Sequence, residues 1–307
     1  MWTNQKNIWK IRRNWNRKYL HQLHSKRVLF SRLVNSLVNL IAISSSENPS
    51  IRPRNVNSNA DIASTSHETR TLSTMTNSFA SDKEKKVTEA AAIIQRSNIV
   101  CFDVDSTVIR EEGIDELAAF CGKRNEVSRL TREAMQGSMT FQDALRKRLE
   151  IINPSQAEIW EFIRTHPSTL SSGLKEFIGY LRERNVEVFL VSGGFDCLIE
   201  PVADQLGIPS ENIYANKLFF TFKGEYAGFD TNQPTSRSGG KAEAIAKIKA
   251  RAAENDIITM IGDGATDLEA SPPANYFIGY GGNIVREEVR NRSTYYITNF
   301  SQLINHH

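Results

Sequence analysis

The chain has 307 residues, 40% of them hydrophobic, which is enough to bury a core but leaves the fold class open. Its net charge of +3 hides a division: residues 1–97 carry 16 Lys and Arg against 6 Asp and Glu, and residues 98–307 carry 22 against 29. A basic segment joined to an acidic body argues against a nucleic-acid-binding protein. The three cysteines lie far apart, which argues against a disulfide scaffold or zinc site and favours a reducing, intracellular compartment.

Residues 1–46 are basic and amphipathic. Nine Lys or Arg precede the first acidic residue, Glu47, and apolar pairs recur at helical spacing between Leu29 and Ile41. This pattern, followed by Ser44–Ser46, is typical of a mitochondrial or plastid transit peptide. The apolar stretch is too short and too interrupted to span a membrane.

Residues 47–81 are rich in Ser, Thr, Asn, Arg and Pro, which predicts a disordered linker. Met75 is a possible internal start, which would leave the protein in the cytoplasm. A tail that has no function, or one that binds membrane or nucleic acid through residues 1–46, is an alternative to the transit peptide.

A helix is expected near Val87–Gln95, and the ordered part of the chain then alternates strands and helices. This alternation predicts an α/β fold, a doubly wound parallel sheet. Apolar, β-branched runs predict buried strands at Asn98–Val104, Val186–Val191, Ile257–Ile261 and Phe277–Tyr280. Helical patterns separate them at Gly173–Arg184, Phe195–Leu206 and Lys241–Ala253.

The first two strands are separated by a long insertion with four helical patterns, at Ile114–Cys121, Val127–Ala134, Phe141–Ile151 and Gln156–Thr165. An insertion of this length predicts a helical cap over the carboxyl edge of the sheet, where open α/β sheets bind ligands. We therefore expect a catalytic core formed by residues 82–111 and 172–307, with a cap at 112–171.

Polar motifs follow three of the predicted strands. Asp103 and Asp105 end the first, and two carboxylates that face one site can bind a hard cation while one attacks phosphorus and the other moves a proton. Ser192, Gly193 and Gly194 end the second, where a hydroxyl and unhindered N–H groups can hold phosphate oxygens.

Two further motifs complete the pattern. Lys241 follows Ser238-Gly239-Gly240 at a helix start, where its charge can stabilise phosphoryl oxygens. Asp263, between two glycines, and Asp267 follow the third strand and could bind or orient a metal ion. Any one of these motifs alone could be a solvated turn, but together they predict a site for phosphoryl transfer.

The order Asp-x-Asp-x-Thr, Ser-Gly-Gly, Lys and Gly-Asp-Gly-x-x-Asp resembles the haloacid dehalogenase superfamily. More narrowly, the segment Cys101–Leu117 resembles the phosphoserine phosphatase family, with the likeness covering roughly residues 98–304. The resemblance implies an Mg²⁺-dependent phosphatase that forms an aspartyl-phosphate on Asp103. Asp105 would protonate the leaving serine oxygen and then activate water.

The same resemblance assigns the other roles. Mg²⁺ would be held by Asp103, Asp263 and the backbone carbonyl of Asp105, with Asp267 in the metal's outer shell. Manganese or cobalt could replace magnesium at such oxygen ligands. The phosphoryl group would be held by Ser192, Gly193 and Lys241, and Gly194 and Thr266 would also contact the substrate.

The resemblance also implies recognition of O-phospho-L-serine by Glu112 for the ammonium, Arg148 for the carboxylate and Met135 above the substrate. Gln136 stands where the family commonly has a glycine, which could alter closure of the cap. Another phosphomonoester substrate, or a catalytically silent scaffold, remain alternatives. The sequence is compatible with a homodimer and does not establish one.

Overall fold

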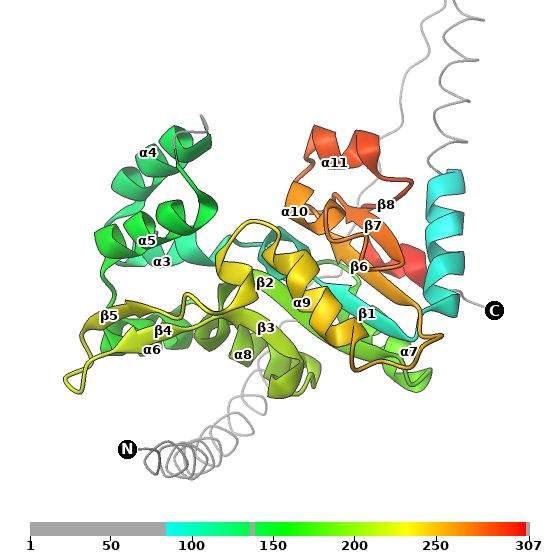
Figure 1. Ribbon diagram of the computed structural model, residues 1–307, viewed down its shortest axis with the longest axis horizontal. Helices are drawn as coiled ribbons and strands as arrows, with labels where there is room; N and C mark the ends of the chain where they lie inside the picture. Colours follow the sequence, from blue (N-terminus) through cyan, green and yellow to red (C-terminus); the bar gives the residue numbers. More distant parts are fainter. Residues whose placement is uncertain (1–83, 136–138, 305–307) are drawn as a thin grey trace, which may run out of the picture. The chain divides into compact units, whose positions relative to one another are not determined.

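The computed structural model describes residues 84–135 and 139–304, and within them six strands form one parallel sheet. The strand order is β3-β2-β1-β6-β7-β8 (Figure 1). Their bounds are β1 (Ile99–Phe102), β2 (Glu187–Phe195), β3 (Ile213–Asn216), β6 (Ile258–Gly262), β7 (Tyr276–Tyr280) and β8 (Tyr295–Ile297). The doubly wound α/β fold predicted from the sequence is confirmed.

The two faces of the sheet bury alternate residues of each strand. In β1, Val100 and Phe102 join one apolar cluster, whereas Ile99 and Cys101 join another on the opposite face. Strand residues point alternately to the two faces, so a strand covered on both sides is a continuous apolar run. This is why β1 could be predicted from the sequence.

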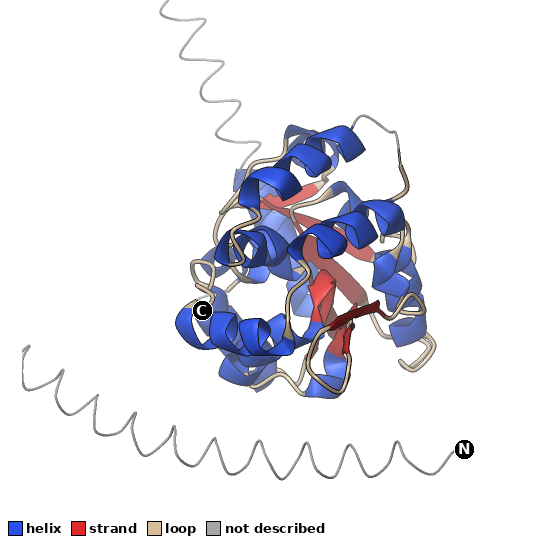
Figure 2. Ribbon diagram, turned by 90° about the vertical axis from the view of Figure 1, so that its left-hand side faces the viewer, coloured by secondary structure: helices blue, strands red, loops and turns tan. Residues whose placement is uncertain are grey.

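Helices cover both faces (Figure 2). The helix at 84–96, with α7 (Leu174–Glu183), α8 (Asp196–Leu206) and the short turn η4 (Phe300–Leu303), packs on the first face. The second face is covered by α9 (Gly240–Lys249) and the segments around α10 (Ala265–Leu268) and α11 (Glu287–Arg292). Figure 1 shows α9 crossing the sheet near β1 and β2.

Four helices form between β1 and β2, where the sequence predicts the cap. They are α3 (Gly113–Phe120), α4 (Arg124–Met135), α5 (Phe141–Ile152) and α6 (Gln156–Thr165). Thr140 and Ser155 begin α5 and α6 as N-caps, each accepting a hydrogen bond from the backbone N–H three residues later. In Figure 1, α3, α4 and α5 group together, away from β7 and β8.

A two-stranded antiparallel hairpin, β4 (Leu218–Phe220) and β5 (Tyr226–Phe229), was not predicted as strands. Leu218 and Phe229 pack with Leu145 and Leu149 of α5, so the hairpin shares an apolar core with the inserted helices. Although it belongs to the sequence range assigned to the catalytic core, it packs as part of the helical region.

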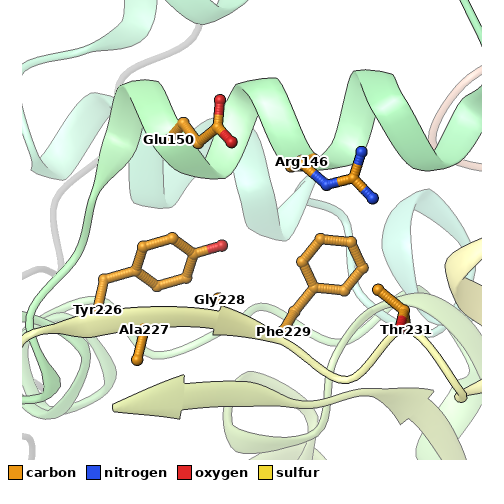
Figure 3. Close-up of a pocket in the computed structure, with 7 residues that line it drawn as sticks. All are labelled: Arg146, Glu150, Tyr226, Ala227, Gly228, Phe229 and Thr231. Atoms are coloured by element: carbon orange, nitrogen blue, oxygen red, sulfur yellow. The ribbon is translucent and has the colours of Figure 1, made fainter. Parts of the chain in front are cut away.

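Between α5 and the hairpin lies a cavity of about 350 Å³. Figure 3 shows the rings of Tyr226 and Phe229 directed toward α5, which carries Arg146 and Glu150. The cavity is lined by Arg146, Glu150, Tyr226, Ala227, Gly228, Phe229 and Thr231. The sequence analysis predicted none of these as a site residue.

The edge strands β3 and β8 were also missed by the sequence analysis. Short turns over Val104–Val108 (η1), Ser210–Asn212 (η2) and Pro234–Ser236 (η3) complete the described elements. Among the described residues, no helix is long and apolar enough to cross a membrane. The predicted transit peptide and linker lie outside the described residues, as does Gln136.

Candidate active site

The predicted motifs meet at the carboxyl edge of the sheet. Asp103 directly follows β1, which lies between β2 and β6, and its N–H donates to the carbonyl of Ile261 in β6 at 2.9 Å. Ser192 lies in β2 and Asp263 directly follows β6. Parallel strands place their carboxyl ends at the same edge, so these residues come together although they are far apart in sequence.

Lys241 joins two of the carboxylates. Its Nζ lies 2.7 Å from Oδ1 of Asp103 and 2.6 Å from Oδ1 of Asp267. Burial alone would lower the pKa of this amine, but the charges of Asp103 and Asp267 raise it above its ordinary value. Lys241 is therefore a fixed cation between two buried acids.

Carboxylate oxygens of Asp103, Asp263 and Asp267 lie within 4.8 Å of one another, and all three residues are buried. Burial, followed by the charge of Asp103, raises the pKa of Asp263 and raises that of Asp267 to about 8. The charge of Asp103 thus disfavours ionisation of the other two carboxyl groups, and the cluster offers only oxygen ligands. These properties fit a hard divalent cation such as Mg²⁺.

The sequence analysis assigned Asp267 to the outer shell of the metal, where it would contact the ligands rather than the ion. In the structure its carboxylate is fully buried in the cluster itself, and it accepts hydrogen bonds from Lys241 and from the N–H of Gly264 at 3.0 Å. A Cβ at Gly262 would overlap this carboxylate, so the glycine is required by the close approach.

With EDTA present, we expect the melting temperature to fall as pH rises from about 5 to about 8. Asp105 and Asp267 have pKa values raised from 3.8 to about 7 and about 8, so in this range the folded protein holds protons that the unfolded chain has lost. Stability therefore decreases with pH. Calorimetry of the wild type and Asp267→Asn checks this: the variant should have a shallower slope, and a flat wild-type profile would contradict the assignment.

Asp105 lies beside the cluster. Its Oδ1 accepts from the N–H of Gly113, the first residue of α3, at 2.8 Å. Burial, then the charges of Asp103 and Glu112, raise its pKa to about 7. A carboxyl group with this pKa can both give and take a proton near neutral pH.

The Ser-Gly-Gly segment approaches the same carboxyl group. A Cβ at Gly194 would lie 3.1 Å from Oδ2 of Asp105 and 3.1 Å from Oγ of Ser192, so a larger residue would crowd both. Ser192 is fully buried and accepts from the Gly194 N–H at 2.9 Å. A Cβ at Gly193 would contact the ring of Phe141 at 3.6 Å, so α5 lies over this segment.

Glu112 lies at the start of α3. Its Oε1 accepts from Oγ of Ser106 at 2.8 Å and from Arg286 at 3.1 Å. Burial raises the pKa of Glu112, and the hydrogen bond from Ser106 opposes the increase. The structure therefore brings Glu112 close to the carboxylate cluster.

The remaining predicted residues differ in their placement. Arg148 lies on α5, where burial lowers the pKa of its guanidinium and the charges of Asp115, Glu112 and Asp105 oppose that change. Within the part of the chain that the structure describes, its buried Nε has no hydrogen-bond partner. Thr266 is exposed on α10, and Met135 ends α4.

The sequence analysis missed Arg286 and Asn283, and it gave no role to Thr107, the threonine of the Asp-x-Asp-x-Thr motif. Arg286 donates to Asp263 at 2.7 Å as well as to Glu112, Thr107 donates to Asp263 at 2.9 Å, and Asn283 contacts the loop after Asp105. Gly281-Gly282-Asn283 follows the predicted strand at Phe277–Tyr280. The same criterion, polar and glycine residues after a buried strand, could have found Asn283.

Comparison with known proteins agrees with this site. Residues 98–275 match the haloacid dehalogenase-like hydrolases. The chain is 64% identical over 215 residues to a phosphoserine phosphatase of Drosophila melanogaster. The matched region covers 70% of this chain and 80% of that protein. It is 50% identical over 208 residues to the chloroplastic phosphoserine phosphatase of Arabidopsis thaliana, over 67% of this chain and 70% of that one.

A solved structure described as a phospho-aspartyl intermediate analogue of phosphoserine phosphatase has a TM-score of 0.56 and 28% identity. The match covers 66% of this chain and 94% of the solved one. The chain therefore belongs to the haloacid dehalogenase-like hydrolases and, within them, to the phosphoserine phosphatase family.

Proposed function

We propose that this enzyme hydrolyses O-phospho-L-serine to L-serine and phosphate through an aspartyl-phosphate on Asp103. The observation that carries the proposal is the pairing of Asp103 with Lys241 at 2.7 Å, beside a second carboxyl group, Asp105, whose pKa is raised to about 7. The names of the relatives support the substrate.

In the first step, an Asp103 carboxylate oxygen forms a bond to phosphorus and the bond from phosphorus to the serine oxygen breaks. Asp105, in its protonated form, gives its proton to that leaving oxygen. In the second step, Asp105 accepts a proton from water as the water oxygen bonds to phosphorus, and the bond from Asp103 to phosphorus breaks. Phosphate is released and both residues return to their starting state.

The phosphoryl oxygens need fixed positive charge and hydrogen-bond donors throughout. Lys241 supplies the charge, and the hydroxyl of Ser192 and the N–H of Gly193 supply the donors. Gly194, whose own N–H donates to Ser192, adds no side chain beside them. Mg²⁺ held by Asp103, Asp263 and the Asp105 carbonyl would neutralise phosphoryl charge. Asp267 holds Lys241 in place, and Thr266 lies at the rim of this group of residues.

The serine part of the substrate carries an ammonium and a carboxylate close to the phosphate. We propose that Glu112 binds the ammonium and Arg148 the carboxylate, with Met135 above the substrate. Burial raises the pKa of Glu112 and lowers the pKa of Arg148, and ionisable groups whose pKa values are shifted in this way are common at functional sites.

A comparison of three phosphomonoesters tests the proposal on the full chain with magnesium. Phosphoserine should be hydrolysed best, and Glu112→Gln should reduce its kcat/KM by about tenfold or more, as expected for the loss of a charged hydrogen bond. Phosphoethanolamine lacks the carboxylate, so Arg148→Gln should affect its hydrolysis far less than that of phosphoserine. Phosphoglycolate lacks the ammonium and should be insensitive to Glu112→Gln.

The outcomes separate the competing functions. If another ester is preferred and Glu112→Gln is neutral toward phosphoserine, the chemistry stands and the substrate assignment is wrong. No phosphate release from any ester by folded protein would favour a catalytically silent scaffold.

The proposal includes a place in metabolism: the reaction would be the last step of serine biosynthesis. Residues 1–46 would act as a mitochondrial or plastid transit peptide, and the chloroplastic relative supports this. The boundaries of the core (82–111 and 172–307) and cap (112–171), like the homodimer, remain predictions.

A further inference from the structure

Asn283 lies in a tightly packed loop directly after β7. A Cβ at Gly281 would overlap the hydroxyl of Tyr296, and one at Gly282 would overlap the hydroxyl of Tyr280. Both tyrosine hydroxyls are buried, so the loop has no room to shift toward the sheet. This packing limits the movement of the backbone that carries Asn283.

The side-chain amide of Asn283 donates to three oxygens. Nδ2 lies 2.6 Å from Oγ of Ser171, 3.0 Å from the carbonyl of Ser106 and 3.3 Å from the carbonyl of Ile109. Oγ of Ser171 itself donates to the carbonyl of Thr107 at 2.6 Å, so it accepts from Asn283. One amide proton then serves Ser171, and the other is shared by the two carbonyls.

These oxygens belong to the two connections between the sheet and the inserted helices. The chain leaves the sheet through Ile109 and returns through Leu170, and these two residues form an antiparallel bridge. The N–H of Arg110 donates to Thr169 at 3.0 Å, and the N–H of Ser171 donates to Val108 at 3.0 Å. Asn283 therefore joins the outgoing and returning connections to the loop after β7.

The hydrogen bond from Asn283 to the carbonyl of Ser106 matters because Ser106 has an unfavourable backbone conformation. This serine is fully buried and has φ of 54°, a left-handed conformation that is unfavourable for a residue other than glycine by about 1–2 kcal/mol. Such a conformation persists only when surrounding contacts hold it. Its carbonyl is held by Asn283, its N–H by the carbonyl of Glu111, and its hydroxyl by Glu112.

We propose that Asn283 is a positioning residue that fixes the loop carrying Asp103 and Asp105 against the two connections to the inserted helices. It does so by holding Ser106 in its left-handed conformation and Ser171 against Thr107. The residue does not touch the substrate. The kinetic part of this inference rests on the proposed function, whereas the structural part does not.

The test compares Asn283→Ala with the wild type in two measurements. Amide hydrogen exchange should become about tenfold faster at residues 106–112 and 169–172, which form the two connections that Asn283 contacts. Exchange should stay unchanged in β6 and β7. With phosphoserine, kcat should fall about tenfold while KM changes less than threefold, because small displacements of reacting groups slow chemistry more than binding. Asn291→Ala, an exposed asparagine on α11, is the matched control and should change neither.

Ser171→Ala provides a second route to the same result. It removes one acceptor of Asn283, so it should reproduce the local increase in exchange, and adding it to Asn283→Ala should produce less than the sum of the two effects. Exchange that increases uniformly over the sheet, or a change confined to KM, would overturn the proposal. A wild type that does not hydrolyse phosphoserine would reject the proposed function, and the exchange data would still decide the role of Asn283.

Discussion

Asp103→Asn should lower phosphoserine turnover by about four orders of magnitude or more, because the amide cannot form the covalent bond to phosphorus. The substitution keeps the shape of the side chain and an oxygen that can accept from the N–H of Val104, as Asp103 does at 2.7 Å. Phosphate release in a continuous assay checks the rate.

The matched controls distinguish loss of the nucleophile from loss of the fold. Asp204→Asn changes an exposed aspartate on α8 and should leave turnover unchanged. The melting temperature of Asp103→Asn in EDTA should stay within about 5 °C of the wild type, since the variant also relieves repulsion within the acidic cluster. Turnover within tenfold of the wild type would exclude Asp103 as the nucleophile.

Lys241→Met should reduce kcat by about 10²–10³-fold, which is typical when a group that stabilises transition-state charge is removed. It should also destabilise the protein by about 3 kcal/mol at pH 8, because Asp103 and Asp267 remain buried without their shared cation. At pH 5 the loss of stability should be smaller, since Asp267, with a pKa of about 8, is then protonated.

A double variant separates the two roles of this lysine. Lys241→Met with Asp267→Asn removes one of the two carboxylates that lose their cation, so part of the lost stability should return at pH 8 while turnover stays low. Lys247→Met, on the exposed side of the same helix, is the control and should affect neither quantity strongly. Recovery of turnover in the double variant would show that Lys241 acts only by balancing charge.

The central strands could be predicted from the sequence, and the edge strands could not. β1 and β6 are buried at every position: IVCF is entirely apolar, and in ITMIG only Thr259 is polar. β3 and β8 lie at the edges, are four and three residues long, and are partly exposed. The hairpin strand β4 has an exposed Phe219 between two half-buried residues, so burial does not mark it in the sequence.

The site residues also divide into those that the sequence predicts and those that it does not. The motifs at the ends of β1, β2 and β6 could be placed because parallel strands end at a common edge. The contacts of Arg286 with Glu112 and of Asn283 with Ser106 join residues 174 and 177 positions apart. No local pattern records which distant partner a side chain meets, so these contacts appear only in the folded chain.

The packing of the β4–β5 hairpin bears on how this fold can be divided. Leu218 and Phe220 join the apolar cluster of α3 and α6, and Phe229 joins that of α5. Removing only residues 112–171 would leave these side chains facing water. A chimaera that exchanges substrate specificity between relatives must therefore transfer two separate pieces of the chain, the four helices and the hairpin, as a single unit.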